Sequence, residues 1–261
     1  MGPVNYGDTI PVAVIKPVGD SRAGDVYSGD IVIPETVTYQ GFTCKVIAIA
    51  NQAFSNRSYE LEWVKGLASF AAPYNTSSTG NSSLTSVTIP NSVITIGKEA
   101  FANCTGLTAI TIPNSVTEIG DGVFEGCIGL SSVNIGNGVK TIGENAFYKC
   151  SSLTSISLGS GVETIDSWAF EDCIALKDFY CFAENIPIIG SDIFSGVNLR
   201  SATLHVPAAS LEAYSAKSPW KIFGQIVPID EGDGIEQVRG NTNSTNQTVY
   251  DLNGRHTTKM Q

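Results

Sequence analysis

Four cysteines recur at a fixed spacing, and the chemistry open to them is metal binding or disulfide formation. Cys104, Cys127, Cys150 and Cys173 lie 23 residues apart. A structural zinc site uses cysteines about two to four residues apart, so this spacing does not fit zinc. In stacked repeats their Cα atoms would lie about 5 Å apart, which a disulfide accepts, although parallel side chains oppose it. The pattern favours reduced, buried cysteines that act as small packing groups.

The remaining polar residues give no catalytic arrangement. The two histidines, His205 and His256, have no serine, cysteine or aspartate at a recognisable spacing, which argues against a nucleophilic triad. The DEGDG run at 230–234 lacks the later glutamate of a calcium-binding loop and is interpreted as a linker. The sequence therefore predicts no catalytic residue, no metal site and no cofactor. Many acidic side chains are predicted to lie on a solvated face, namely Glu99, Glu118, Asp121, Glu125, Glu144, Glu163, Asp166, Glu171 and Asp172.

The cysteines belong to a longer repeat that must position every other side chain. The copies share the pattern L-x-x-[VI]-x-[IL]-[PG]-x-x-V-x-x-I-[GD]-x-x-[AV]-F-x-x-C, and a fixed period of this kind predicts a solenoid. Alternation such as Val87-Thr88-Ile89 predicts a strand with one buried face. The phenylalanines are expected in the interior. They are Phe101, Phe124, Phe147 and Phe170, and the leucines with a 23-residue spacing are Leu84, Leu107, Leu130, Leu153, Leu176 and Leu199.

The period also suggests boundaries. Residues 1–27 are predicted to be an N-terminal strand cap, and residues 28–205 the solenoid, whose first coil, 28–54, contains a hairpin around TYQGFTC. Leu61 is in register with the other leucines, so residues 61–83 are interpreted as a degenerate coil. Residues 206–230 are predicted to be a C-terminal cap with a short helix followed by Trp220 and Phe223, and residues 231–261 a flexible tail.

Composition excludes some classes of function. The net charge of −10 and the isoelectric point near 4.6 argue against a nucleic-acid partner. No apolar run approaches the roughly 20 residues of a membrane span. The first residues, MGPVNYGD, have no signal-peptide pattern and are typical of a trimmed mature product or of a recombinantly expressed chain.

The segment IPNSVTEIGDGVFEGC and its sister copies, with YSGDIVIP before them and LHVPAASLEAYSAKSPWKIF after them, closely resemble a known family. They are similar to the leucine-rich repeats of the BspA-like (Treponema-type) family of bacterial surface proteins. The resemblance covers roughly residues 27–229. It implies a leucine-rich repeat solenoid, with parallel β-strands and short turns or 3₁₀ pieces in 23-residue coils. It also implies a secreted or cell-surface protein, often one for adhesion. The tail VYDLNGRHTTK resembles, more weakly, the C-terminal segments of secreted Bacteroidetes-type proteins.

The best candidate surface is the outward face of the predicted strands. In the central coils this face carries small hydroxyl side chains, such as those of Thr108, Thr111 and Ser132, which can be purely structural. Its character changes in the C-terminal coils, where tyrosine and arginine occur, and these residue types are enriched in binding hot spots. An exposed Trp63 or Trp168 would strengthen a binding role. The candidate residues are Thr154, Ser157, Lys177, Asp178, Tyr180, Arg200 and Thr203.

Three classes of function follow. The favoured one is a monomeric, non-enzymatic, secreted or cell-surface module that binds an extracellular protein or glycan through its strand face. The alternative is a structural spacer without a specific ligand. An enzyme has the least support, and a closed pocket with convergent titratable groups would be its sign.

Overall fold

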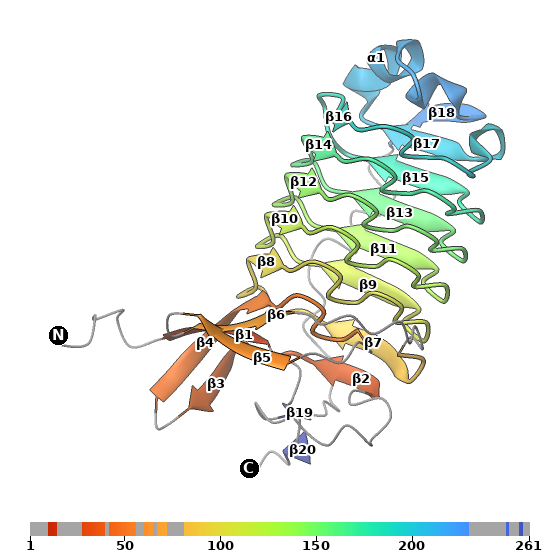
Figure 1. Cartoon of the computed structure of the whole chain (residues 1–261). Helices are drawn as coiled ribbons and strands as arrows, with labels where there is room; N and C mark the ends of the chain where they lie inside the picture. The colour runs from red at the N-terminus through yellow and green to blue at the C-terminus, as the bar shows by residue number, and fades with distance from the viewer. Residues whose placement is uncertain are drawn as a thin grey trace.

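The computed structural model describes residues 10–14, 28–39, 42–55, 60–64, 67–71, 81–229, 249–250 and 256–257. The chain winds into stacked coils, and the regular coils each contribute one strand to a sheet of longer strands and one to a sheet of shorter strands (Figure 1). The leucine-rich repeat solenoid predicted from the sequence is therefore confirmed, as are the parallel strands and the short turns between them.

The sheet of longer repeat strands, called here the larger sheet for the length of those strands, has six parallel strands in the order β18-β17-β15-β13-β11-β9. In its regular part, residues 23 apart pair with each other, as Ala109 does with Ser132. The strands are β9 Ala109–Ile112, β11 Ser132–Ile135, β13 Ser155–Leu158, β15 Asp178–Cys181, β17 Thr203–Val206 and β18 Gln225–Pro228.

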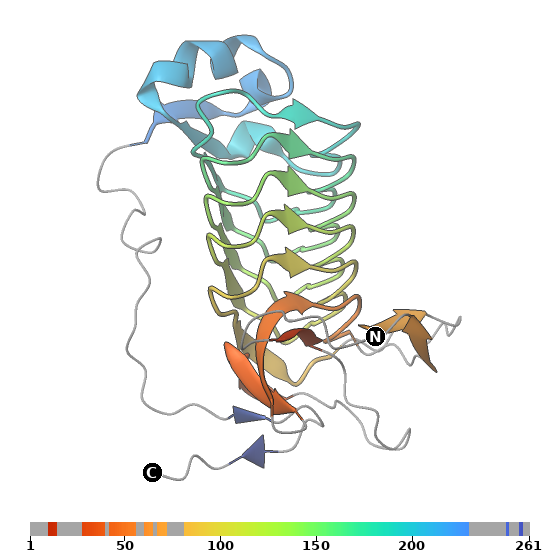
Figure 2. The same ribbon diagram turned by 90° about the vertical axis from the view of Figure 1, so that its left-hand side faces the viewer.

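The second sheet has eight strands, and its two-residue strands from the regular coils face the viewer in Figure 2. Its order is β1-β4-β8-β10-β12-β14-β16, and β3 pairs antiparallel with β4, which confirms the hairpin predicted in the first coil. The strands are β1 Ile10–Val14, β3 Thr36–Tyr39, β4 Phe42–Ile49, β8 Thr95–Ile96, β10 Glu118–Ile119, β12 Thr141–Ile142, β14 Thr164–Ile165 and β16 Ile188–Ile189.

The core between the two sheets is a column of side chains that repeat from coil to coil. Phe124 is fully buried, and its ring stacks on Phe101 at 5.3 Å between centroids and on Phe147 at 5.2 Å. The column begins at Phe54 and continues through Phe170 to Phe194. Because each ring packs against the next, no coil closes its core alone, and the stack is held together by its neighbours.

All six cysteines are buried as thiols, which agrees with the packing interpretation. The structure adds a hydrogen bond, since the Cys127 thiol donates to the carbonyl oxygen of Phe101 in the preceding coil, 3.0 Å away. Cys150 donates in the same way to Phe124, and Cys173 to Phe147. Burial raises the pKa of Cys127 and of Cys173 to about 12. Each of these carbonyl oxygens also accepts a backbone N–H bond, as that of Phe101 does from Cys104 at 3.0 Å, so the thiol adds a second donor that links one coil to the preceding one.

The structure corrects the prediction that residues 61–83 form a degenerate coil of the solenoid. Strand β2 (Gly29–Val32) pairs with β7 (Leu84–Thr88), and β4 pairs with β8, so the first coil stacks directly on the coil that begins at Leu84. Strands β5 (Glu60–Val64) and β6 (Leu67–Ala71) instead form an antiparallel hairpin that joins neither ladder. Leu61 pairs with Phe70 in this hairpin. Its agreement with the leucine period is coincidental.

The register also changes near the C-terminal end. Asp178 pairs with Thr203, 25 residues later, whereas the regular coils pair residues 23 apart. Phe194 follows Phe170 by 24 residues, and although the leucine spacing of 23 residues continues to Leu199, the strand that follows this leucine is displaced. Leu199 opens a 3₁₀ turn, η1 (Leu199–Ser201), and the strand β17 begins two residues later than the repeat predicts.

A helical cap closes this end of the stack, at the top of Figure 1. It consists of η2 (Ala208–Ser210), α1 (Leu211–Ala216) and η3 (Trp220–Ile222). Tyr214, Trp220 and Phe223 are buried, and the Tyr214 hydroxyl donates to the carbonyl oxygen of Ala183 at 2.9 Å. The larger sheet continues into this region as β18. In the predicted tail, only β19 (Val249–Tyr250) and β20 (His256–Thr257) lie within the described residues.

Candidate functional site

The outward side of the larger sheet, called here the strand face, is built by simple alternation. In β9 to β17, buried residues alternate with residues that are exposed or half-buried. The outward residues form two rows that run across neighbouring strands. One row contains Ala109, Ser132, Ser155, Asp178 and Thr203, and the other contains Thr111, Asn134, Ser157, Tyr180 and His205.

Several hydroxyl groups beside these rows serve the stack itself. The Ser131 hydroxyl donates to the carbonyl oxygen of Thr108 at 2.9 Å, and the Thr154 hydroxyl donates to that of Ser131 at 3.0 Å. Nearer the N-terminal end, Thr85 and Ser86 both donate to the Asp30 carboxylate. The hydrogen bond from Ser86 and, to a smaller extent, the one from Thr85 lower the pKa of Asp30. Such hydroxyls link one coil to the next, which is a structural role.

The face changes at β15 and β17, where Asp178, Tyr180 and His205 form one cluster. The Tyr180 and His205 rings stack at 4.0 Å between centroids with 15° between their planes. His205 Nε2 lies 3.1 Å from Asp178 Oδ1, and the His205 side chain is only 12% exposed. The other ring nitrogen, Nδ1, is buried and has no hydrogen-bond partner among the described residues. Packing and a polar contact therefore hold the histidine ring in one orientation.

The structure brings some of the candidate residues together and separates others. Asp178 and Thr203 are paired neighbours, and Tyr180 and Ser157 are paired neighbours on the other row. Lys177, Thr154 and Arg200 lie outside the strands themselves. Lys177 is exposed immediately before β15, Thr154 lies immediately before β13 with its hydroxyl bonded to Ser131, and Arg200 is exposed within η1.

His205 is a member of this cluster that was not among the candidate residues predicted from the sequence, where it is the last residue of the predicted solenoid. The signal that could have found it is the alternation in Thr203-Leu204-His205-Val206, which extends the strand beyond the position set by Leu199. The two-residue shift of β17 hid this signal, because counting from Leu199 ended the strand too early.

Neither Trp63 nor Trp168, the two tryptophans considered for a binding role, is found on the strand face among the described side chains. Trp168 is 38% exposed and has a φ of 58°, in a turn after β14 rather than on the strand face. The side chain of Trp63 lies outside the part of the chain whose side chains are described. An exposed tryptophan thus exists, but it does not extend the Tyr180 cluster.

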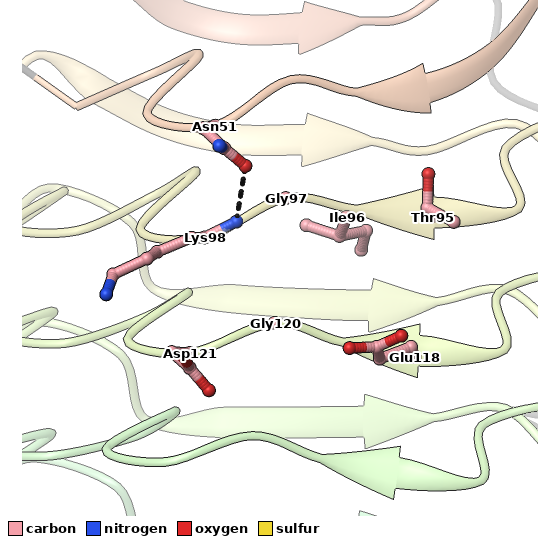
Figure 3. A pocket seen from close by; sticks show the side chains of 8 residues that line it. All are labelled: Asn51, Thr95, Ile96, Gly97, Lys98, Glu118, Gly120 and Asp121. Atoms are coloured by element: carbon pink, nitrogen blue, oxygen red, sulfur yellow. Dashed lines mark hydrogen bonds between the residues drawn. The ribbon is translucent and has the colours of Figure 1, made fainter. Parts of the chain in front are cut away.

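An open pocket of about 290 Å³ lies on the other side of the stack, beside β8 and β10 (Figure 3). Its charged residues, Lys98, Glu118 and Asp121, are all exposed. A side chain at its Gly97 would meet the backbone nitrogen of Asn51 at 2.7 Å, so coil packing explains the glycine. This hollow is not the closed pocket with convergent titratable groups that an enzyme requires.

Neither a metal site nor a membrane-spanning helix is found in the described ranges of the chain. Within them, no three or more histidine, cysteine, aspartate or glutamate side chains gather as a metal site would require. No helix in the same ranges is long and apolar enough to cross a membrane.

Comparisons with known proteins complete the description of the site. A family profile described as "BspA type Leucine rich repeat region" matches residues 75–200 in six copies. A comparison with curated proteins gave no match. Among solved structures, a leucine rich repeat protein of T. pallidum is 22% identical, covers 86% of this chain and 93% of its own, and has a TM-score of 0.45. A leucine rich cell surface protein from Faecalibacterium prausnitzii is 18% identical, and the match covers 78% of this chain and 88% of that protein, with a TM-score of 0.37.

Proposed function

Since residues 75–200 belong to the BspA-type leucine-rich repeat family, we propose that this protein is a monomeric, non-enzymatic binding module of a bacterial cell surface. It contacts an extracellular partner through the strand face, at strands β15 and β17. The observation that carries the proposal is the cluster of Asp178, Tyr180 and His205, where aromatic and charged side chains replace the small hydroxyls of the preceding strands.

Binding energy at protein surfaces is concentrated in a few residues, and tyrosine is prominent among them. The Tyr180 ring is pre-organised by its stacking on His205, and the histidine ring is held by Asp178. A partner therefore loses little free energy in ordering these side chains when it binds.

The second candidate function is a spacer that holds other segments away from the cell surface. The hydrogen bonds that Ser131 and Thr154 donate to preceding coils favour it, because they give the hydroxyls a structural use. A spacer has no need for the cluster at β15 and β17, which distinguishes the two functions.

The test is a binding screen of the whole chain against extracellular matrix proteins, plasma proteins and glycans, repeated with Tyr180→Ala. The matched control is Asn134→Ala, since Asn134 lies in the same outward row, two strands away. Saturable binding that Tyr180→Ala weakens at least 10-fold and Asn134→Ala leaves unchanged would support the proposal. Only salt-sensitive, non-saturating signals would favour the spacer.

A further inference from the structure

Three basic side chains lie on the side of the larger sheet where its neighbouring strands begin. Lys177 precedes β15, Arg200 lies in η1 before β17, and Lys221 lies in η3 before β18. These segments are direct neighbours. The Thr203 backbone N–H donates to the Lys177 carbonyl oxygen at 2.7 Å, and that of Gly224 donates to the Leu199 carbonyl oxygen at 2.9 Å. All three basic side chains are exposed, and we call them the basic edge.

The basic edge stands out against an acidic stack. Residues 81–175 contain three basic and nine acidic residues, whereas residues 176–229 contain four of each. Among the described residues, Lys140 forms an ion pair with Glu163 and His205 lies against the Asp178 carboxylate, and neither contact involves the basic edge. The stack is therefore negative along its middle coils and offers cationic groups at this end, which favours an anionic partner oriented towards the C-terminal coils.

The basic edge adjoins the cluster of the proposed function. Lys177 is the residue before Asp178, which pairs with Thr203, and Tyr180 lies in the same strand. Cationic groups immediately before β15, β17 and β18 thus adjoin a stacked aromatic pair and hydroxyl side chains on β15 and β17 and on the neighbouring β13. We propose that this surface binds an anionic polysaccharide, whose carboxylate or sulfate groups contact the basic edge while its sugar rings lie on the strand face.

The composition of the strand face favours a polysaccharide over a protein. A protein interface has a desolvated apolar core surrounded by a polar rim. The described outward residues of β9 to β17 offer no such core apart from the Tyr180–His205 pair. A sugar chain instead has dense hydroxyl groups that hydrogen-bond to side chains such as Ser155 and Ser157, and apolar C–H faces that pack against aromatic rings.

This inference rests on the proposed function, and one experiment separates the two. The whole chain is tested for binding to immobilised heparin, polygalacturonate, neutral dextran and poly-glutamate. A variant with Lys177→Glu, Arg200→Glu and Lys221→Glu removes the basic edge. The control variant carries Lys98→Glu, Lys140→Glu and Lys149→Glu. It has the same change in net charge at exposed sites elsewhere, and the one exposed ion pair that it breaks contributes little. Circular dichroism and thermal unfolding establish that both variants are folded.

We expect the whole chain to bind heparin or polygalacturonate but not dextran. This binding should be weakened about 10- to 100-fold in the basic-edge variant and less than about 3-fold in the control variant. Equal losses in the two variants, equally tight binding to poly-glutamate, or binding to dextran alone would each overturn the inference. If Tyr180→Ala abolishes binding to a neutral or protein partner that the basic-edge variant retains, the inference fails while the proposed function stands. If neither variant alters binding to any partner, both fail.

Discussion

Replacing Phe124 with alanine probes the aromatic column that joins the coils. The side chain is fully buried, and deletion of a buried phenylalanine costs about 3–5 kcal/mol of unfolding free energy. Its ring also stacks on Phe101 and on Phe147, with interplanar angles of 4° and 11°. Each such contact contributes about 0.5–1.5 kcal/mol beyond burial. We therefore expect Phe124→Ala to lie in the upper part of the 3–5 kcal/mol range.

Urea unfolding followed by far-ultraviolet circular dichroism measures this loss, with Thr111→Ala as the control. Thr111 is exposed on the strand face, and its replacement should change stability by no more than about 0.5 kcal/mol. A double-mutant cycle with Phe101→Ala should give a coupling of about 0.5–1.5 kcal/mol, because the rings are in direct contact. Equal effects of Phe124→Ala and Thr111→Ala would refute the assignment of inside and outside, and a coupling near zero would refute the stacking.

Three further outcomes are expected. Gly138→Ala should destabilise the protein by at least about 1–3 kcal/mol in thermal or urea unfolding, because the added Cβ would collide with the carbonyl oxygen of Asn114; no loss would mean that the coils are less closely packed. Asp172→Gly should raise stability by about 1 kcal/mol, because φ is 58° at this residue and glycine relieves the strain; a clear loss in the same assay would contradict this. Thiol alkylation at pH 8 should be slow in the native protein, because the thiols of Cys127 and Cys173 are buried with pKa values near 12, and should reach all six cysteines after denaturation. Rapid alkylation of either native thiol, or fewer than six after denaturation, would be inconsistent with that.

The regular coils were predictable because one period determines their packing. Once Phe101 and Phe124 are taken as interior residues 23 apart, the apolar residues of each strand must face the interior and the polar residues that alternate with them must face outward. The carbonyl acceptors of the cysteine thiols were not predictable in the same way, since they depend on the path of the turn and not on the spacing.

The irregular coils escaped prediction for two physical reasons. In a ladder, each strand pairs only with the strands next to it in space, so a long insertion in the chain between β4 and β8 is tolerated. The 23-residue period of the later coils does not reveal this insertion. The in-register Leu61 was consequently mistaken for part of a coil. At the other end, a 3₁₀ turn around Leu199 absorbs two residues, which moved His205 onto the strand face.

The central claim is that strands β15 and β17 form the binding surface. Backbone amide shifts measured by nuclear magnetic resonance, during titration with a ligand from the binding screen, test it most directly. The account predicts that the largest changes fall on residues 177–181 and 203–206, with little change on the short strands β8 to β14. Changes centred on the pocket beside Lys98 and Glu118, or spread evenly along the stack, would contradict it.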